Sequence, residues 1–148
     1  MPTTQLSPHF TLAEMTYSQT AAAMGIDNTP PSDVLAELTR TCEMMEKSRA
    51  ALGGLPITVT SGYRSEAVNK AVGGVGKSQH QTGQACDFIC PGFGDPQAIC
   101  QKLEPMMKDL GIDQLIWEFN SWVHVSQASA PRYMALTIDN SGTRTGIA

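Results

Sequence analysis

The longest regular pattern of apolar residues in the chain has the spacing of an α-helix. It begins after two helix-breaking prolines at 30–31 and stops at a glycine pair at 53–54, as helices commonly do. Ser32 or Asp33 can cap its first turn. We therefore predict one long helix whose apolar stripe covers the core. The stripe is formed by Val34, Leu35, Leu38, Cys42, Met45 and Leu52.

Two shorter helices are predicted before this one. Thr11 and Glu14 have the spacing of a capping box, in which each side chain binds a backbone N–H group near the other residue. A short helix should therefore run over 12–17. An alanine run at 21–23 favours a second helix, and Gly25 is suited to end it.

Short β-branched and apolar runs predict strands in the rest of the chain. The runs at 57–60 and 84–89 have the length and composition of strands. Two further runs, 114–119 and 122–126, lie on either side of a polar pair at 120–121, a pattern that is typical of a β-hairpin.

Helices are predicted between these strands. Ser65 can cap a helix over 67–71. An aspartate and a proline at 95–96 suit the cap and the first turn of another helix. Pro105 should kink or split that helix, and Gly111 should end it.

The length of 148 residues fits one domain that buries a core without disulfides. We predict a single globular domain, 1–148. It comprises a helical N-terminal part (1–54), a core that contains the predicted strands (55–136) and a C-terminal tail (137–148). We expect a monomer.

Composition excludes some partners. A net charge of -4 leaves no basic surface for nucleic acid, and no run approaches the roughly 20 apolar residues of a membrane span. The cysteines lack CxxC spacing, so we expect buried, reduced thiols. They are Cys42, Cys86, Cys90 and Cys100.

A carboxylate stands in one of the apolar strands. Asp87 lies within Ala85–Ile89, where an unpaired charge would cost several kcal/mol, so it must have a partner. The partner of this charge could be an arginine or backbone N–H groups. It could also be a metal ion that Asp87 shares with His80, which lies seven residues upstream across a glycine.

A second histidine occupies a strand position that faces away from two valines. In 122–126, alternation places Trp122, His124 and Ser126 on one side of the strand. Such a histidine is commonly a core residue with satisfied hydrogen bonds. Together with His80 and Asp87, however, it gives two imidazoles and one carboxylate. A hydrolytic zinc site uses three such ligands and keeps a fourth position for water.

Glu118 is the candidate general base. It interrupts an apolar run and would otherwise be an outward-facing strand position. If the hairpin loop comprises the three residues 120–122, Glu118 lies directly opposite His124 on the same face. A two-residue loop would place the two side chains on opposite faces.

Several motifs together resemble a known family. The chain is similar to the zinc D-alanyl-D-alanine peptidases and to related phage-encoded cell-wall peptidases, with the motifs in the same order over nearly the whole chain. The string Ser-x-His-x-x-Gly-x-Ala-x-Asp at 78–87 is a specific signature. The other motifs are His9-Phe10-Thr11-Leu12-x-Glu14, Gly25-Ile26-Asp27-Asn28-x-Pro30, Ser61-Gly62-Tyr63-Arg64-Ser65, Asn69 with Val72-Gly73-Gly74, and Trp122-Val123-His124-Val125-Ser126.

The resemblance implies a hedgehog-like α+β fold, with helices packed against a small antiparallel sheet, and a zinc ion bound by His80, Asp87 and His124. Many relatives have an acidic general base three positions before the last ligand, where this chain has Ser121. Glu118, six positions before it, matches the arrangement of the hedgehog signalling domain.

The resemblance also implies that Arg64 clamps a carboxylate or carbonyl oxygen of the substrate. A guanidinium suits a planar carboxylate, although an arginine here could equally hold a loop through backbone hydrogen bonds. Ser78 could orient the site or cap a turn. Trp122 could form a wall of the substrate pocket or belong to the core.

The function expected on these grounds is zinc-dependent hydrolysis of a peptide bond in bacterial peptidoglycan, with the stem peptide as substrate. A D,D bond is favoured because Arg64 could hold a terminal carboxylate. We expect a phage or prophage lysis enzyme, or a virion-associated one, that is made in the cytoplasm without a signal peptide and acts on the cell wall. The alternative is a catalytically silent zinc protein, such as a phage tail component, because hedgehog domains keep the site without established hydrolysis.

Overall fold

The computed structural model describes residues 4–74, 76 and 78–147. Its helices are α1 (Leu12–Thr16), α2 (Gln19–Met24), α3 (Ser32–Ala51), α4 (Glu66–Ala71), α5 (Pro96–Leu103) and α6 (Met107–Leu110), with the 3-10 helix η1 (Glu104–Met106) between the last two. Its strands are β1 (Gln5–Ser7), β2 (Phe10–Thr11), β3 (Thr58–Ser61), β4 (Ala85–Ile89), β5 (Gln114–Glu118), β6 (Trp122–Ser126), β7 (Met134–Asp139) and β8 (Gly142–Thr145).

The predicted helix signals are confirmed, with one exception. Thr11 and Glu14 form the capping box of α1, and the Ser65 hydroxyl caps α4. The cap predicted for α3 is wrong, because Pro31 is its N-cap residue and no side chain caps it. Ser32 and Asp33 lie inside the first turn instead, where the charge of Asp33 favours the positive end of the helix dipole.

The main sheet has the strand order β3-β4-β6-β5-β7-β8, and β1 and β2 pair separately. The α+β class is confirmed, but the sheet is mixed, since β7 runs parallel to β5. The predicted tail is wrong over its described residues, 137–147, because they complete β7 and form β8. The physical reason is the free edge of β5, whose N–H and C=O groups β7 pairs.

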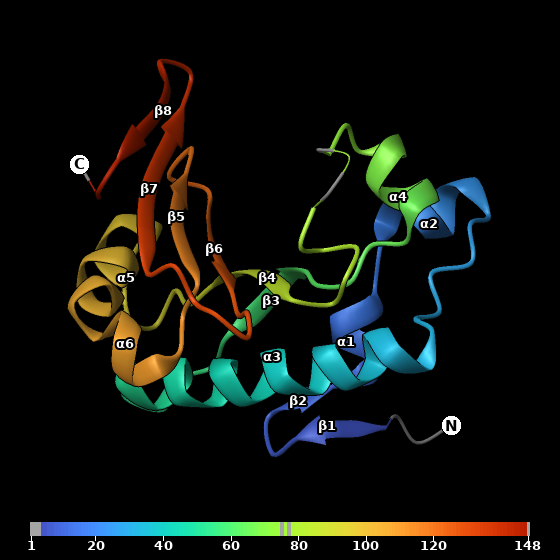
Figure 1. Ribbon diagram of the computed structural model, residues 1–148, viewed down its shortest axis with the longest axis horizontal. Helices are drawn as coiled ribbons and strands as arrows, with labels where there is room; N and C mark the ends of the chain where they lie inside the picture. Colours follow the sequence, from blue (N-terminus) through green and yellow to red (C-terminus); the bar gives the residue numbers. More distant parts are fainter. Residues whose placement is uncertain (1–3, 75, 77, 148) are drawn as a thin grey trace.

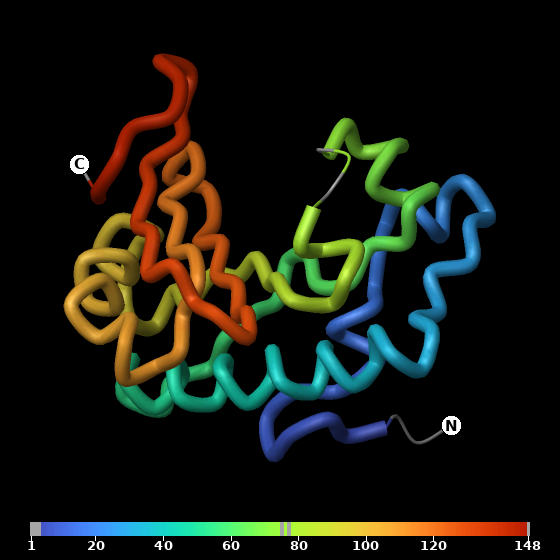
Figure 2. Tube along the Cα trace, in the orientation of Figure 1, coloured from blue at the N-terminus to red at the C-terminus, as the bar shows by residue number. Residues whose placement is uncertain are grey.

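Two lobes lie on either side of β3 and β4. In Figure 2 the blue and green segments with α1, α2 and α4 form one lobe, and the yellow to red segments from α5 to β8 form the other. The long helix α3 runs beneath both (Figure 1). The core lies between α3, α5 and one face of the sheet. Phe88, Val123 and Val125 are fully buried on that face, whereas Asp87 and His124 alternate with them and face the other side.

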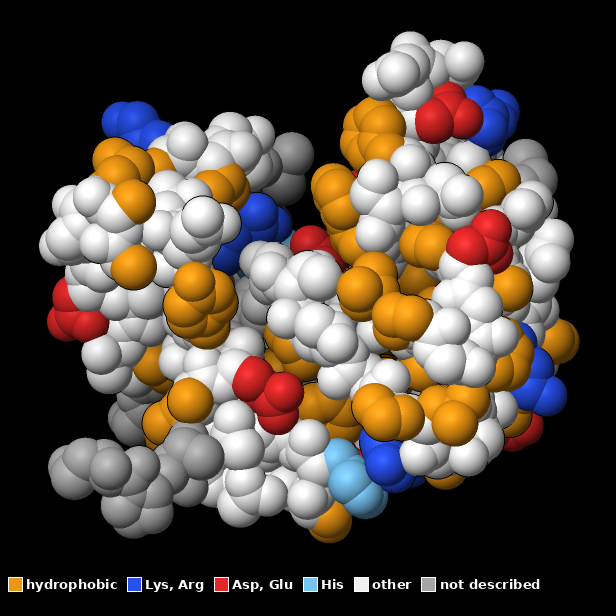
Figure 3. Space-filling model, turned by 180° about the vertical axis from the view of Figure 1, so that it is seen from behind, with side chains coloured by type: hydrophobic (Ala, Val, Ile, Leu, Met, Phe, Trp, Pro, Cys, Tyr) orange, Lys and Arg blue, Asp and Glu red, His pale blue; other side chains and the backbone are white. Residues whose placement is uncertain are grey.

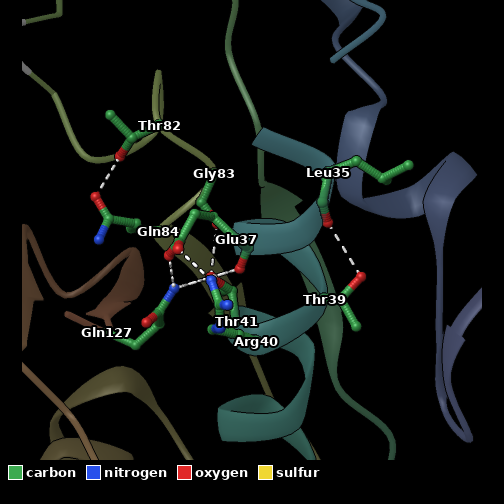
Figure 4. A network of polar contacts seen from close by, with 9 residues as sticks. All are labelled: Leu35, Glu37, Thr39, Arg40, Thr41, Thr82, Gly83, Gln84 and Gln127. Carbon is green, nitrogen blue, oxygen red and sulfur yellow. Dashed lines mark hydrogen bonds and ion pairs between the residues drawn. The ribbon is translucent and has the colours of Figure 1, made fainter. Parts of the chain in front are cut away.

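Polar contacts on α3 fix the chain on both sides of the candidate ligands. The buried Thr41 hydroxyl donates to the Gly83 carbonyl at 2.6 Å, and Gly83 lies between His80 and Asp87. The Gln127 amide, which follows β6, donates to the Glu37 carboxylate at 2.9 Å. Figure 4 shows the side chains of Thr41 and Gln127 meeting at the same turn of the helix. One helix therefore anchors the loop before β4 and the end of β6.

Candidate metal centre

Three side chains that are far apart in the sequence converge on the face of the sheet that points away from the hydrophobic core. His80, Asp87 and His124 are buried and offer ligand atoms that all lie within 4.8 Å of one another. His80 Nε2 lies 3.3 Å from Asp87 Oδ1, and His124 Nδ1 lies 2.9 Å from the same oxygen. The ring centroids of the two histidines are 5.2 Å apart.

Strand pairing brings two of these residues together. Asp87 of β4 and His124 of β6 are direct partners in an antiparallel pair, so their side chains share a face and lie side by side. Burial acts to raise the pKa of Asp87. The charge of His80 and the hydrogen bond to His124 outweigh it and hold that pKa well below its ordinary value. The carboxylate is therefore charged and ready to bind a cation.

His80 comes from a loop whose geometry is set by a close backbone approach. Its Nδ1 lies 2.7 Å from the Gly62 carbonyl oxygen, to which it donates a hydrogen bond, and its Nε2 is left to face Asp87. A Cβ atom at position 62 would lie 2.2 Å from the Met15 carbonyl oxygen, so only glycine fits there. The Ser78 hydroxyl accepts a hydrogen bond from the His80 N–H at 3.1 Å. Ser78 thus caps the turn that presents His80.

The donor set fits zinc. Zinc takes imidazole nitrogen and carboxylate oxygen readily, and three protein ligands leave a position for water. The carbonyl of Gly62 fixes the orientation of one imidazole, as outer partners of metal ligands commonly do. These three residues could therefore hold the ion.

Glu118 lies on the same face of the sheet as His124, although not directly opposite it. The hairpin loop between β5 and β6 has three residues, as in one of the two predicted alternatives. These residues are 119–121 rather than 120–122. Glu118 pairs with Trp122, and Ile116 pairs with His124. Burial, and then the charge of Asp87, raise the pKa of Glu118 above its ordinary value, and the charges of His124 and Arg64 oppose this. A carboxylate with a raised pKa is suited to accept a proton at neutral pH.

Arg64 and Trp122 line the cavity above the three candidate ligands. This cavity of about 710 Å³ also contains Ser78 and Glu118 in its walls. The Arg64 guanidinium makes no hydrogen bond to a residue that the structure describes, and its Nε is buried. Burial lowers its pKa, against the charges of Asp87 and Glu118. Its donors are therefore free for a ligand, rather than engaged in holding a loop.

His9 and the four cysteines lie outside the metal centre. His9 Nδ1 lies 2.7 Å from the Glu46 carboxylate, far along the chain from the candidate ligands. All four cysteines are buried and free. Burial raises the pKa of Cys42 and Cys100 to about 12, so these thiols stay protonated at neutral pH.

Asp113 is a supporting residue that the sequence patterns did not reveal. It is 1% exposed and accepts hydrogen bonds from the Arg132 guanidinium at 2.7 and 3.0 Å. It also accepts one from the Gln79 amide at 3.0 Å. Asp113 thus joins the residue before His80 to the chain that enters β7. The only signal for it in the sequence was the position of this aspartate, between the predicted helix end at Gly111 and the apolar run at 114–119.

Replacing Asp113 with asparagine is expected to reduce the free energy of unfolding by about 1–2 kcal/mol near neutral pH. The hydrogen bonds from Arg132 lower the pKa of Asp113 from 3.8 to about 2. Because the pKa is lower in the folded state, this stabilisation is full above 3.8 and is lost as the pH falls toward about 2. Urea unfolding of both proteins over this pH range measures the difference.

The control for this experiment is Asp139→Asn, which removes an exposed pair with Arg144 that water screens. Its unfolding curve should stay close to that of the parent protein. A difference for Asp113→Asn that does not shrink in acid would contradict the assigned ion pair.

Comparison with known proteins supports this geometry. The family model for peptidase M15 matches residues 8–126, which is most of the chain and includes all three candidate ligands. The chain belongs to the peptidase M15 family. Members of this family are zinc peptidases, so the predicted resemblance and the predicted zinc cofactor are confirmed. No curated protein matches the chain. No helix among the described residues of this M15 peptidase is long and apolar enough to cross a membrane.

Proposed function

We propose that this M15 peptidase hydrolyses a peptide bond in bacterial peptidoglycan, with a D,D bond of the stem peptide as the favoured target. The observation that carries the proposal is the convergence of His80, Asp87 and His124 beneath a cavity that Glu118 also lines. A phage or prophage lysis enzyme, or a virion-associated enzyme, is the biological role that this chemistry suits.

The proposal gives each residue of the centre a role. His80, Asp87 and His124 would hold zinc, which when bound would supply a Lewis acid for the scissile carbonyl and for the attacking water. Glu118 accepts a proton from the attacking water and returns it to the amine that leaves when the C–N bond breaks. Its raised pKa supports both transfers.

The remaining residues position the substrate. The Arg64 guanidinium binds a carboxylate or carbonyl oxygen next to the scissile bond, which is supported by its place in the cavity and its free donors. Trp122 forms a wall beside Glu118. Its indole N–H has no hydrogen bond of normal geometry, but it lies close enough to Glu118 to lower the pKa of that carboxyl. Ser78 contributes by holding the turn at His80.

Digestion of purified peptidoglycan tests the proposal. Zinc-loaded protein is expected to release soluble peptide fragments, identified by mass spectrometry. A chelator should abolish the release, and added zinc should restore it, because three ligands alone supply no Lewis acid. Release that continues after complete removal of zinc would contradict the proposal. An intact, zinc-loaded protein that releases nothing would favour the alternative of a silent structural protein.

A further inference from the structure

A second cavity opens from the metal centre. It has a volume of about 420 Å³ and shares Arg64, Asp87 and Trp122 with the larger cavity. Its other walls come from the segment 17–20, which leads into α2, from residues 60–61 of β3, and from Val68 and Val72 in and just after α4. Figure 3 shows the molecule from behind, hollowed between its two lobes, with acidic and basic side chains at the bottom of the hollow.

Strand order places the two cavities on opposite sides of the candidate ligands. Asp87 is on β4 and His124 is on β6, which are neighbours in the middle of the sheet. The smaller cavity is bounded by β3, on the outer side of β4. The larger one extends over β5 and β7, beyond β6, where Ile116 and Leu136 line it. The two cavities thus form one cleft that crosses the sheet and passes the metal centre.

A β-bulge shapes the β3 side of this cleft. Val59 pairs with Phe88 and Ser61 pairs with Asp87, so Thr60 is an extra residue in β3. In a regular strand, Thr60 and Ser61 would point to opposite faces. Both line the smaller cavity instead, because a bulge re-aims the side chains around it. The bulge therefore places both residues in the wall of the cleft on the side away from β5.

Each arm of the cleft mixes polar and apolar side chains. The β3 arm is lined by hydroxyl and amide side chains from 18–20 and 60–61 and by the apolar Val68 and Val72, and the charges among its described lining residues belong to Arg64 and Asp87 at the junction. The β5 arm is lined by the apolar Ile116 and Leu136 and by the polar Gln114 and Arg132. Beyond the junction, no described lining residue of the β3 arm carries a charge that could capture a chain terminus. Both arms suit an extended peptide, whose backbone needs hydrogen-bond partners and whose small side chains need apolar contacts.

We infer that the substrate peptide occupies both arms and that the bond cut is an internal one, which makes this protein an endopeptidase. The inference rests on the proposed function and adds the position of the bond within the substrate. Arg64 lies at the junction of the arms, where it would contact a carbonyl oxygen next to the cut bond. Binding energy from residues on both sides then contributes to the reaction rate.

The length of the products tests the inference. In a digest of cross-linked peptidoglycan by zinc-loaded protein, both fragments from each cut bond should carry at least two amino-acid residues. Release of single terminal amino acids alone would overturn the inference and leave the proposed function standing. Absence of any zinc-dependent hydrolysis would overturn both, so the two failures are distinguishable.

Filling the β3 arm tests the same inference independently. Thr60→Trp should slow the release of fragments roughly tenfold, and Thr20→Trp, on the opposite wall, should do the same. The matched control is Thr58→Trp, since Thr58 is exposed on the same strand and lines neither cavity. This control should cut at the parent rate. Parent rates with unchanged products for both filled variants, each shown by circular dichroism to be folded, would overturn the inference.

Discussion

Replacing Glu118 with glutamine is expected to reduce the turnover of peptidoglycan by at least about 10²-fold, as the loss of a general base does. Glutamine keeps the size of the side chain but cannot accept the proton from water. Glu118 is not among the three candidate ligands, so zinc content and the thermal unfolding midpoint should stay close to those of the parent protein. Fragment release, metal analysis and circular dichroism measure the three quantities.

The matched control is Glu104→Gln, an exposed glutamate at the start of η1 and away from the sheet. It should retain full turnover. If Glu118→Gln were equally active, the general base would have to be another group. The strand register supports Glu118 as the general base. Glu118 pairs with Trp122, and Trp122 and the candidate ligand His124 lie on the same face of β6.

The His124→Ala variant is expected to lose stoichiometric zinc. Removal of a direct ligand should weaken zinc affinity by more than the roughly 10 to 100-fold that loss of an outer partner costs. His124 Nδ1 faces the Asp87 carboxylate at 2.9 Å, and alanine offers no donor in its place. Equilibrium dialysis against zinc gives the affinity, and the peptidoglycan digest gives the accompanying loss of activity.

His9→Ala is the appropriate control for zinc binding, since His9 contacts Glu46 rather than the metal centre. It should bind one zinc ion as the parent does. Unchanged zinc affinity in His124→Ala would remove the basis of the metal centre. A zinc-free but folded His124→Ala protein would instead show that the ion is needed for chemistry and not for the fold.

Local signals in the sequence predicted most elements because they act over short distances. The capping box at Thr11, the hydroxyl cap at Ser65 and the split at Pro105 concern only a few neighbouring residues. The alternation of β6 likewise depends only on strand geometry. It correctly placed His124 on the face of the strand opposite Val123 and Val125. The family resemblance predicts that His124 is a zinc ligand, and the structure places it beside His80 and Asp87.

The register of the β5–β6 hairpin could not be predicted from local patterns. Loop length decides which residues are partners, and a shift of one residue moves a side chain to the other face. The structure has its loop at 119–121, where Phe119 and Asn120 adopt φ values of 54° and 47°. Glycine is the residue usually expected at such angles, so its absence hid the position of the turn. The predicted C-terminal tail failed for a related reason, because its pairing partner β5 is distant in the sequence.

The sequence by itself determined the residue types that can bind zinc, their order, and the helices and strands that carry them, because these follow from side-chain chemistry and short-range backbone preferences. Tertiary structure alone decided that His80, Asp87 and His124 meet within 4.8 Å, that Asp113 joins Gln79 to Arg132, and that a cleft continues past the metal centre to Thr60. Those features depend on strand order and on contacts between distant segments. They are set by the free energy of the whole packed chain rather than by any local pattern.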